Sequence, residues 1–95
     1  MLNSRREVVS QSNQVGIEFL LVDLRTAFTF LDIAEITAVE ETRARNLAHV
    51  RRVYATLLRF SPKIAPSPRQ AAELTAGIAE LRRRLEEAGY LLPSE

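Results

Sequence analysis

The sequence has no cysteine, no tryptophan and only one histidine, His49. Without cysteine the chain can form no disulfide, no thiolate zinc site and no cysteine nucleophile, and this composition fits a reducing compartment. A single imidazole provides no histidine pair for a metal, and no glycine-rich phosphate loop or nucleophile elbow is present. We therefore predict that the chain is not an enzyme and that it has no metal site and no cofactor.

An excess of charge of one sign is also missing, as are long apolar runs. The 95 residues include 13 Lys and Arg against 12 Asp and Glu, which gives a formal net charge of +1. A domain that binds nucleic acid over its whole surface has a stronger basic excess. No stretch approaches the ~18 apolar residues of a membrane span, and the N-terminal residues do not resemble a secretory signal. We expect one cytoplasmic domain that does not enter a membrane.

The positions of the prolines predict where helices are possible. All four lie beyond Ser61, and before that point apolar residues recur every three or four positions, which is typical of helix rather than strand. Thr37 and Glu40 have the spacing of a capping box. We therefore predict helices at about 14–35 and 38–60, and so short a connection makes them an antiparallel hairpin.

A third helix is predicted after a proline-containing linker. Ser67, Pro68 and Gln70 provide an N-cap, a proline at the first helical position and a reciprocal glutamine, and Gly89 suits a left-handed C-terminal cap. This helix should span about 68–88. On its exposed side the i,i+4 spacing predicts three ion pairs: Glu80 with Arg84, Arg82 with Glu86, and Arg83 with Glu87.

These elements predict an all-α, three-helix antiparallel bundle. The helical domain should occupy residues 14–92, after a frayed or helical extension over residues 1–13 and before a tail at 93–95. We expect residues 90–92 to fold back onto the bundle. A domain of this size buries a small core, and oligomerisation is a common way to stabilise it.

The first predicted helix has two apolar faces instead of one. The first closes the bundle and consists of Ile17, Leu20, Leu21, Leu24, Ala27, Phe28, Leu31 and Ala34. The second consists of Val15, Phe19, Val22, Thr26, Phe30 and Ile33. Two partner helices cannot easily cover both faces, and a bare second face would exceed the apolar patch that a soluble monomer usually exposes.

Two interpretations of the second face remain open. In the first, it is a homodimer interface, most simply one copy of the helix against another about a two-fold axis, or a docking face for an amphipathic partner helix. In the second, residues 1–13 or 90–92 fold over it within the same chain. We take the first as the working hypothesis, which makes the chain a small interaction or scaffolding module.

Arginines on the second predicted helix suggest two further sites. Arg51 projects among apolar positions, level with Asp23, which predicts a partly buried ion pair, with an anion site as the alternative. Arg45, Arg52 and Arg59 recur at heptad spacing and could contact phosphates. Because Glu41 shares that line and an Arg-rich genome would give the same bias, nucleic-acid binding is the alternative function.

His49 gives a more remote alternative. With Arg52 three residues later, it resembles the phospho-accepting site of histidine phosphotransfer domains. The resemblance implies a solvent-facing imidazole that attacks a phosphoryl donor. Arg52 stands where those domains usually have Lys, Val53 where they have a small Gly, and the fourth helix is missing. An exposed His49 without a chemical role is the simpler prediction.

Overall fold

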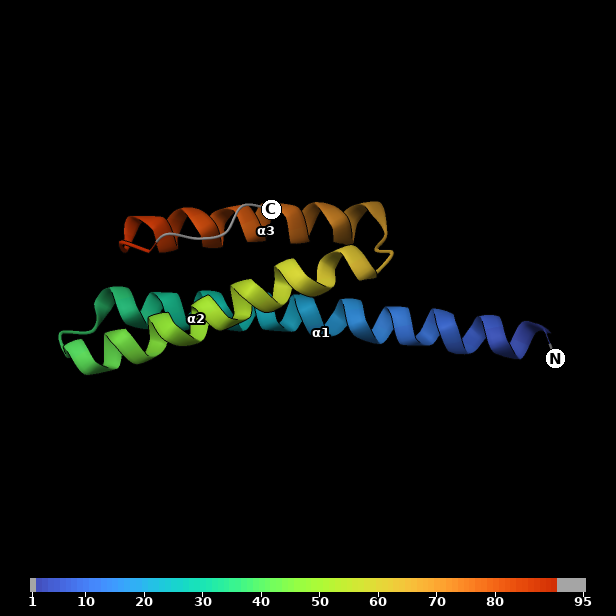
Figure 1. The fold of residues 1–95 in the computed structure, drawn as a ribbon, viewed down its shortest axis with the longest axis horizontal. Helices are drawn as coiled ribbons and strands as arrows, with labels where there is room; N and C mark the ends of the chain where they lie inside the picture. Colours follow the sequence, from blue (N-terminus) through green and yellow to red (C-terminus); the bar gives the residue numbers. More distant parts are fainter. Residues whose placement is uncertain (1, 91–95) are drawn as a thin grey trace.

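The computed structural model describes the backbone of residues 2–90 and the side chains of residues 12–90. Three α-helices, α1 (Leu2–Ile36), α2 (Glu40–Phe60) and α3 (Pro68–Glu87), and one 3₁₀ turn, η1 (Ser61–Lys63), make up the described chain, which contains no strand. Figure 1 shows α2 returning along the second half of α1, with α3 lying alongside the pair. The predicted all-α three-helix bundle is confirmed.

α1 is much longer than the predicted helix at about 14–35. It begins at Leu2, so residues 2–13 continue along the same axis, and the N-terminal part of the helix projects beyond the ends of α2 and α3 (Figure 1). The molecule consequently measures 57 × 22 × 19 Å. Because this extension runs on along the helix axis, it does not fold back over the second apolar face of α1.

The turn between α1 and α2 corrects one prediction. The capping box across Thr37 and Glu40 is not formed, since Val39 is the N-cap of α2 and makes no side-chain cap hydrogen bond. The Thr37 hydroxyl instead accepts a hydrogen bond of 3.2 Å from the backbone N–H of Val39. Bonding two residues downstream occupies the hydroxyl, so α2 begins at Glu40 instead of Ala38.

Both ends of α3 have the expected caps. The Ser67 hydroxyl accepts from the backbone N–H of Gln70, and the Gln70 side chain accepts from the backbone N–H of Ser67, so this capping box is present. At the other end Gly89 has φ 98°, and the N–H groups of Gly89 and Tyr90 bond to the carbonyls of Glu86 and Leu85. This is a Schellman cap, which ends α3 at Glu87.

The core lies along the line where the three helices meet. It is formed by the bundle-facing stripe of α1 together with one face of each partner helix. Its buried members are Ile17, Leu20, Leu21, Leu24, Ala27, Leu31 and Ala34 from α1; Leu47, Val50, Val53, Tyr54 and Leu57 from α2; and Leu74, Ile78, Leu81 and Leu85 from α3. Phe28, the remaining member of the predicted stripe, is half-buried against this core.

α1 and α3 approach each other closely at Gly77. A Cβ atom built on Gly77 would overlap the Leu24 side chain, which is itself fully buried. The absence of a side chain at Gly77 therefore permits the close crossing of these two helices.

Candidate interaction surface

The face of α1 that points away from the bundle is largely exposed. Val15 is 64% exposed, Phe19 61%, Val22 55% and Ile33 37%. Thr26, in the middle of this row, is exposed as well. We call Val15, Phe19, Val22, Thr26 and Ile33 the outer face of α1. Large apolar side chains follow one another along a single helix face with no described part of the chain covering them.

Phe30, the sixth residue predicted for this face, is placed differently. It is half-buried, and its ring lies against that of His49, with centroids 4.4 Å apart and the planes tilted by 56°. His49 is half-buried by the same contact, so the prediction of an exposed histidine is wrong. The imidazole is covered by an aromatic ring, unlike the solvent-facing phospho-accepting site that the sequence resembled.

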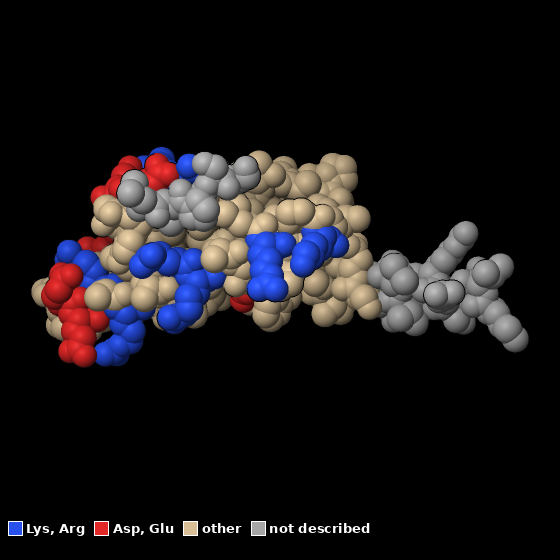
Figure 2. Space-filling view, viewed as in Figure 1, with Lys and Arg blue, Asp and Glu red and all other residues tan. Residues whose placement is uncertain are grey.

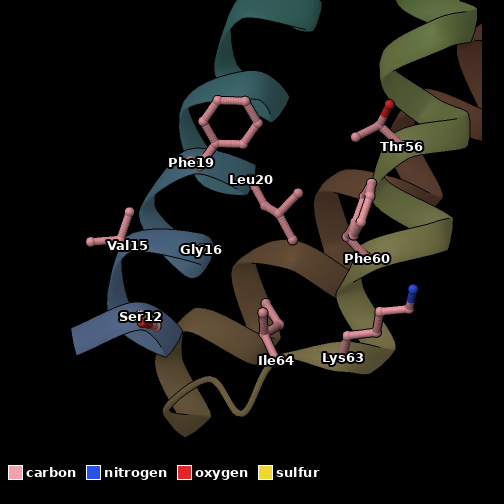
Figure 3. Close-up of a pocket in the computed structure, with 9 residues that line it drawn as sticks. All are labelled: Ser12, Val15, Gly16, Phe19, Leu20, Thr56, Phe60, Lys63 and Ile64. Atoms are coloured by element: carbon pink, nitrogen blue, oxygen red, sulfur yellow. The ribbon is translucent and has the colours of Figure 1, made fainter. Parts of the chain in front are cut away.

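An apolar groove of about 680 Å³ opens between the N-terminal half of α1 and the end of α2. Figure 3 shows Phe19 and Phe60 on opposite sides of it, with Leu20 and Ile64 between them. Its full lining is Ser12, Val15, Gly16, Phe19, Leu20, Thr56, Phe60, Lys63 and Ile64. Val15 and Phe19 belong to both the groove and the outer face, so the two form one continuous apolar surface.

The end wall of the groove is held by Asn13. Its side-chain amide donates to the carbonyl of Ala65 at 3.1 Å and accepts from the N–H of Ala65 at 2.8 Å. This two-bond clasp ties the linker after η1 to α1. It holds the neighbouring Ile64 beside Gly16, where a Cβ would lie 3.5 Å from the Ile64 side chain. No local sequence pattern predicts this contact, because 52 residues separate its partners.

The predicted arginine row is exposed along α2. Arg45, Arg52 and Arg59 are all solvent-exposed, and Arg45 lies 3.6 Å from Glu41 in the preceding turn. Seven Lys or Arg residues and no Asp or Glu occur between residues 42 and 72. Figure 2 shows Lys and Arg side chains recurring along this face, while the visible acidic side chains gather mainly at one end of the molecule, at the α1–α2 turn and at the C-terminal end of α3.

The predicted pair of Arg51 with Asp23 is not formed. Arg51 is exposed, and its guanidinium carbon lies 4.4 Å from the centroid of the Tyr90 ring. Asp23 is half-buried, and no ion pair joins it to Arg51 among the residues with described side chains. Tyr90 packs against the core after the Schellman cap and offers Arg51 an aromatic face, which the helical wheel of α2 alone could not show.

Ion pairs hold the opposite flank of α1 to α3. Arg84 Nη2 lies 2.7 Å from a Glu35 carboxylate oxygen and 3.1 Å from an Asp32 oxygen, and the Arg84 side chain is only 15% exposed. Nearer the groove end of the bundle, Arg25 bonds Glu73 at 3.0 Å. Burial lowers the pKa of Arg84, but the hydrogen bonds to Glu35 and Asp32 outweigh it, so this pKa lies above its ordinary value.

Because Arg84 pairs with α1, the ion pairs along α3 differ from the predicted ones. The predicted pairs of Arg82 with Glu86 and of Arg83 with Glu87 are present, whereas that of Glu80 with Arg84 is wrong. Glu80 instead bonds Arg83, one turn away at i,i+3. The hydrogen bond from Arg83 lowers the pKa of Glu80 below its ordinary value. This exposed network belongs to the solvated side of α3 and not to the apolar surface.

Among the helices in the described part of the chain, none combines the length and the apolar composition that a membrane crossing requires. No group of three or more His, Asp or Glu side chains there is placed to hold a metal ion. Comparison of the chain with protein-family models, with curated proteins and with solved structures found no match.

Proposed function

We propose that the chain is a small non-catalytic interaction module that self-associates through the outer face of α1. The observation that supports this most strongly is the exposure of Val15, Phe19 and Val22 on one face of a helix whose other side is fully packed. Removing apolar area from water stabilises an association in proportion to the area buried. A second copy of the same face is the simplest cover, because a two-fold axis makes one patch complementary to itself.

The fold presents this face on a firm support. Ile17, Leu20 and Leu24, on the opposite side of the same helix, are buried in the core. α3 fixes one flank through Arg84 and Arg25, and Asn13 ties the other flank to the linker. A partner therefore meets a preorganised helix, which lowers the entropic cost of association.

Sedimentation velocity at increasing protein concentration tests the proposal. We expect the unmodified chain to form a dimer and Phe19→Glu to stay monomeric with its helical content and thermal stability retained, because Phe19 is exposed in the single chain. Ala76→Glu adds the same charge at an exposed position of α3 and should still dimerise. A monomeric unmodified chain at high micromolar concentration would rule the proposal out, as would equal effects of the two variants.

Nucleic-acid binding through Arg45, Arg52 and Arg59 is the second candidate function. It is favoured by the stretch from residue 42 to residue 72, which contains no acidic residue. A mobility shift with double-stranded DNA that persists at physiological salt and disappears in the triple Arg→Gln variant would support it. Absence of retention on heparin would exclude it, since phosphate contacts depend on exposed cations.

A further inference from the structure

The groove has the size and lining of a site for a small amphiphile. Its volume of about 680 Å³ lies inside the range of roughly 300–1,000 Å³ that small-molecule sites occupy. Phe19, Leu20, Phe60 and Ile64 provide apolar walls and floor. The polar groups are few: the hydroxyls of Ser12 and Thr56 and the ammonium of Lys63.

The charged side chains nearest the groove are cations, which favours an anionic ligand. Lys63 is exposed, its ammonium lies 5.2 Å from the centroid of the Phe60 ring, and no carboxylate pairs with it among the side chains that the structure describes. Arg59 lies over the same ring at 5.3 Å. No acidic residue lines the groove. A ligand with one anionic group could pair with a cation beside Phe60, while its apolar body packs against the apolar walls of the groove.

The groove is formed before any ligand arrives. The Asn13 clasp on Ala65 fixes the linker, and the buried side chains of Leu20 and Leu57 fix the helices on either side. Gly16 contributes no side chain to the floor, which leaves this part of the groove open.

We propose that this groove binds a medium-chain fatty carboxylate such as dodecanoate. The alkyl chain lies between Phe19 and Phe60, over Leu20 and Ile64. The carboxylate lies at the rim beside Phe60, and the Lys63 side chain, whose ammonium points out of the groove in Figure 3, turns towards it to bond it. This site does not depend on the proposed self-association, although Val15 and Phe19 belong to both surfaces.

Isothermal titration with dodecanoate below its micellar concentration tests the proposal directly. We expect one saturable site per chain. Each buried methylene contributes ~0.8 kcal/mol, so decanoate should bind up to about 15-fold more weakly than dodecanoate. Dodecanol, which has the same chain and no charge, should bind about threefold more weakly, as for loss of an exposed ion pair. Absence of saturable binding, or equal affinity for the acid and the alcohol, would overturn the proposal.

Two variants of Gly16 separate a filled groove from a misfolded chain. Gly16→Leu places a side chain in the groove and should abolish dodecanoate binding, whereas Gly16→Ala should retain it. Gly16→Ala replaces a helical glycine and should keep or raise the melting temperature. Gly16→Leu gains the same helix propensity but pushes against Ile64, so circular dichroism must show that its helical content is retained. If Gly16→Leu binds as well as Gly16→Ala does, the ligand lies elsewhere.

Lys63 offers a second readout, because it is the only lysine in the chain. Dodecanoate should slow acetylation of the Lys63 side chain, followed by mass spectrometry, and dodecanol should not. Lys63→Gln should bind dodecanoate about as weakly as the unmodified chain binds dodecanol. Unchanged acetylation with saturating dodecanoate would contradict the assigned position of the carboxylate.

The proposed ligand site and the proposed dimer can be tested independently. Val22 lies on the outer face of α1 but does not line the groove. Val22→Glu should therefore dissociate the dimer and retain dodecanoate binding. Loss of binding together with the dimer would show that the ligand site exists only between two copies, which contradicts a groove complete in one chain.

Discussion

The two flanks of α1 differ in whether another part of the described chain packs against them. Towards α3 the flank is closed: Gly77 lets the helices approach at Leu24, and Arg84 bonds Asp32 and Glu35. Away from α3 lie the apolar groove and the outer face of α1, where Phe19 is 61% exposed. Charged side chains that pair with each other at the edge of a packed interface are typical of a surface that faces water. Large apolar side chains that lie exposed next to one another are typical of a surface that binds a partner. The open flank is therefore the side on which we place the function.

The largest effect should come from filling the close crossing on the closed flank. Gly77→Ala puts a methyl group into the Leu24 side chain, and this overlap should outweigh the ~1 kcal/mol gained by replacing a helical glycine. We expect a net cost of about 1–2 kcal/mol, a fall in melting temperature of roughly 4–8 °C per kcal/mol for a domain this small. Gly16→Ala, a matched change on the open flank, should not destabilise the fold. Thermal unfolding followed by circular dichroism compares the two. Equal melting temperatures would show that α1 and α3 do not cross closely at Gly77.

A smaller effect is expected at Arg84. Arg84→Met removes the ion pairs to α1 and should cost about 1 kcal/mol, because Glu35 and Asp32 remain more than half exposed and can be solvated. Arg83→Met is the control, since the partners of Arg83 among the described side chains, Glu80 and Glu87, lie on its own helix. Urea unfolding should give the larger loss for Arg84→Met, and 1 M salt should reduce the difference. A larger loss for Arg83→Met would contradict the assigned bridge.

Sequence and structure agree where the interactions are local or periodic. The repeat of apolar residues placed Leu20, Leu57 and Leu81 in the core, and the short-range cap signals at Ser67 and Gly89 predicted the ends of α3 to within about a residue. Such features depend on residues within one or two turns of each other, and the sequence displays that spacing directly.

The features that sequence missed depend on the distance between helices. A helical wheel gives the direction of Arg84 but not the depth of the α1–α3 contact, so a local partner at Glu80 was predicted in place of Glu35. The same limit hid the role of Gly77 and the contact of Phe30 with His49. Most of the residues predicted for the outer face are exposed, as expected. The groove beside it could not be predicted, because one of its walls is formed by the linker, whose position a helical wheel does not give.

Breaking the clasp on the open flank should cost less than breaking the bridge on the closed one. Asn13→Ala removes two hydrogen bonds to Ala65 and should lower stability by about 0.5–1 kcal/mol. Asn13→Asp keeps the acceptor for the Ala65 N–H, so its stability should lie between that of the unmodified chain and that of Asn13→Ala. Hydrogen exchange at the Ala65 amide should accelerate in Asn13→Ala more than exchange in the middle of α2. Unchanged exchange at Ala65 would contradict the clasp.

The smallest effect should accompany titration of Glu80. Its pKa in the folded chain is lowered by the hydrogen bond from Arg83. Stability from this pair is therefore fully present above the unfolded pKa of the carboxyl and is lost as pH falls through the folded pKa. Glu80→Gln should flatten the acid limb of the stability curve slightly, and carboxyl NMR titration should show the lowered pKa. A Glu80 pKa at or above the ordinary value would contradict the pairing.

The central claim, that a second copy covers the outer face of α1, is tested most directly by spin labels in this naturally cysteine-free chain. Thr26→Cys places a label in the middle of the outer face, and Ala76→Cys places one on the exposed side of α3. Dipolar spectroscopy on the dimer should give a short distance between the two Thr26→Cys labels and a longer one between the Ala76→Cys labels. No coupling between copies for either variant, or the shorter distance at Ala76→Cys, would contradict the account.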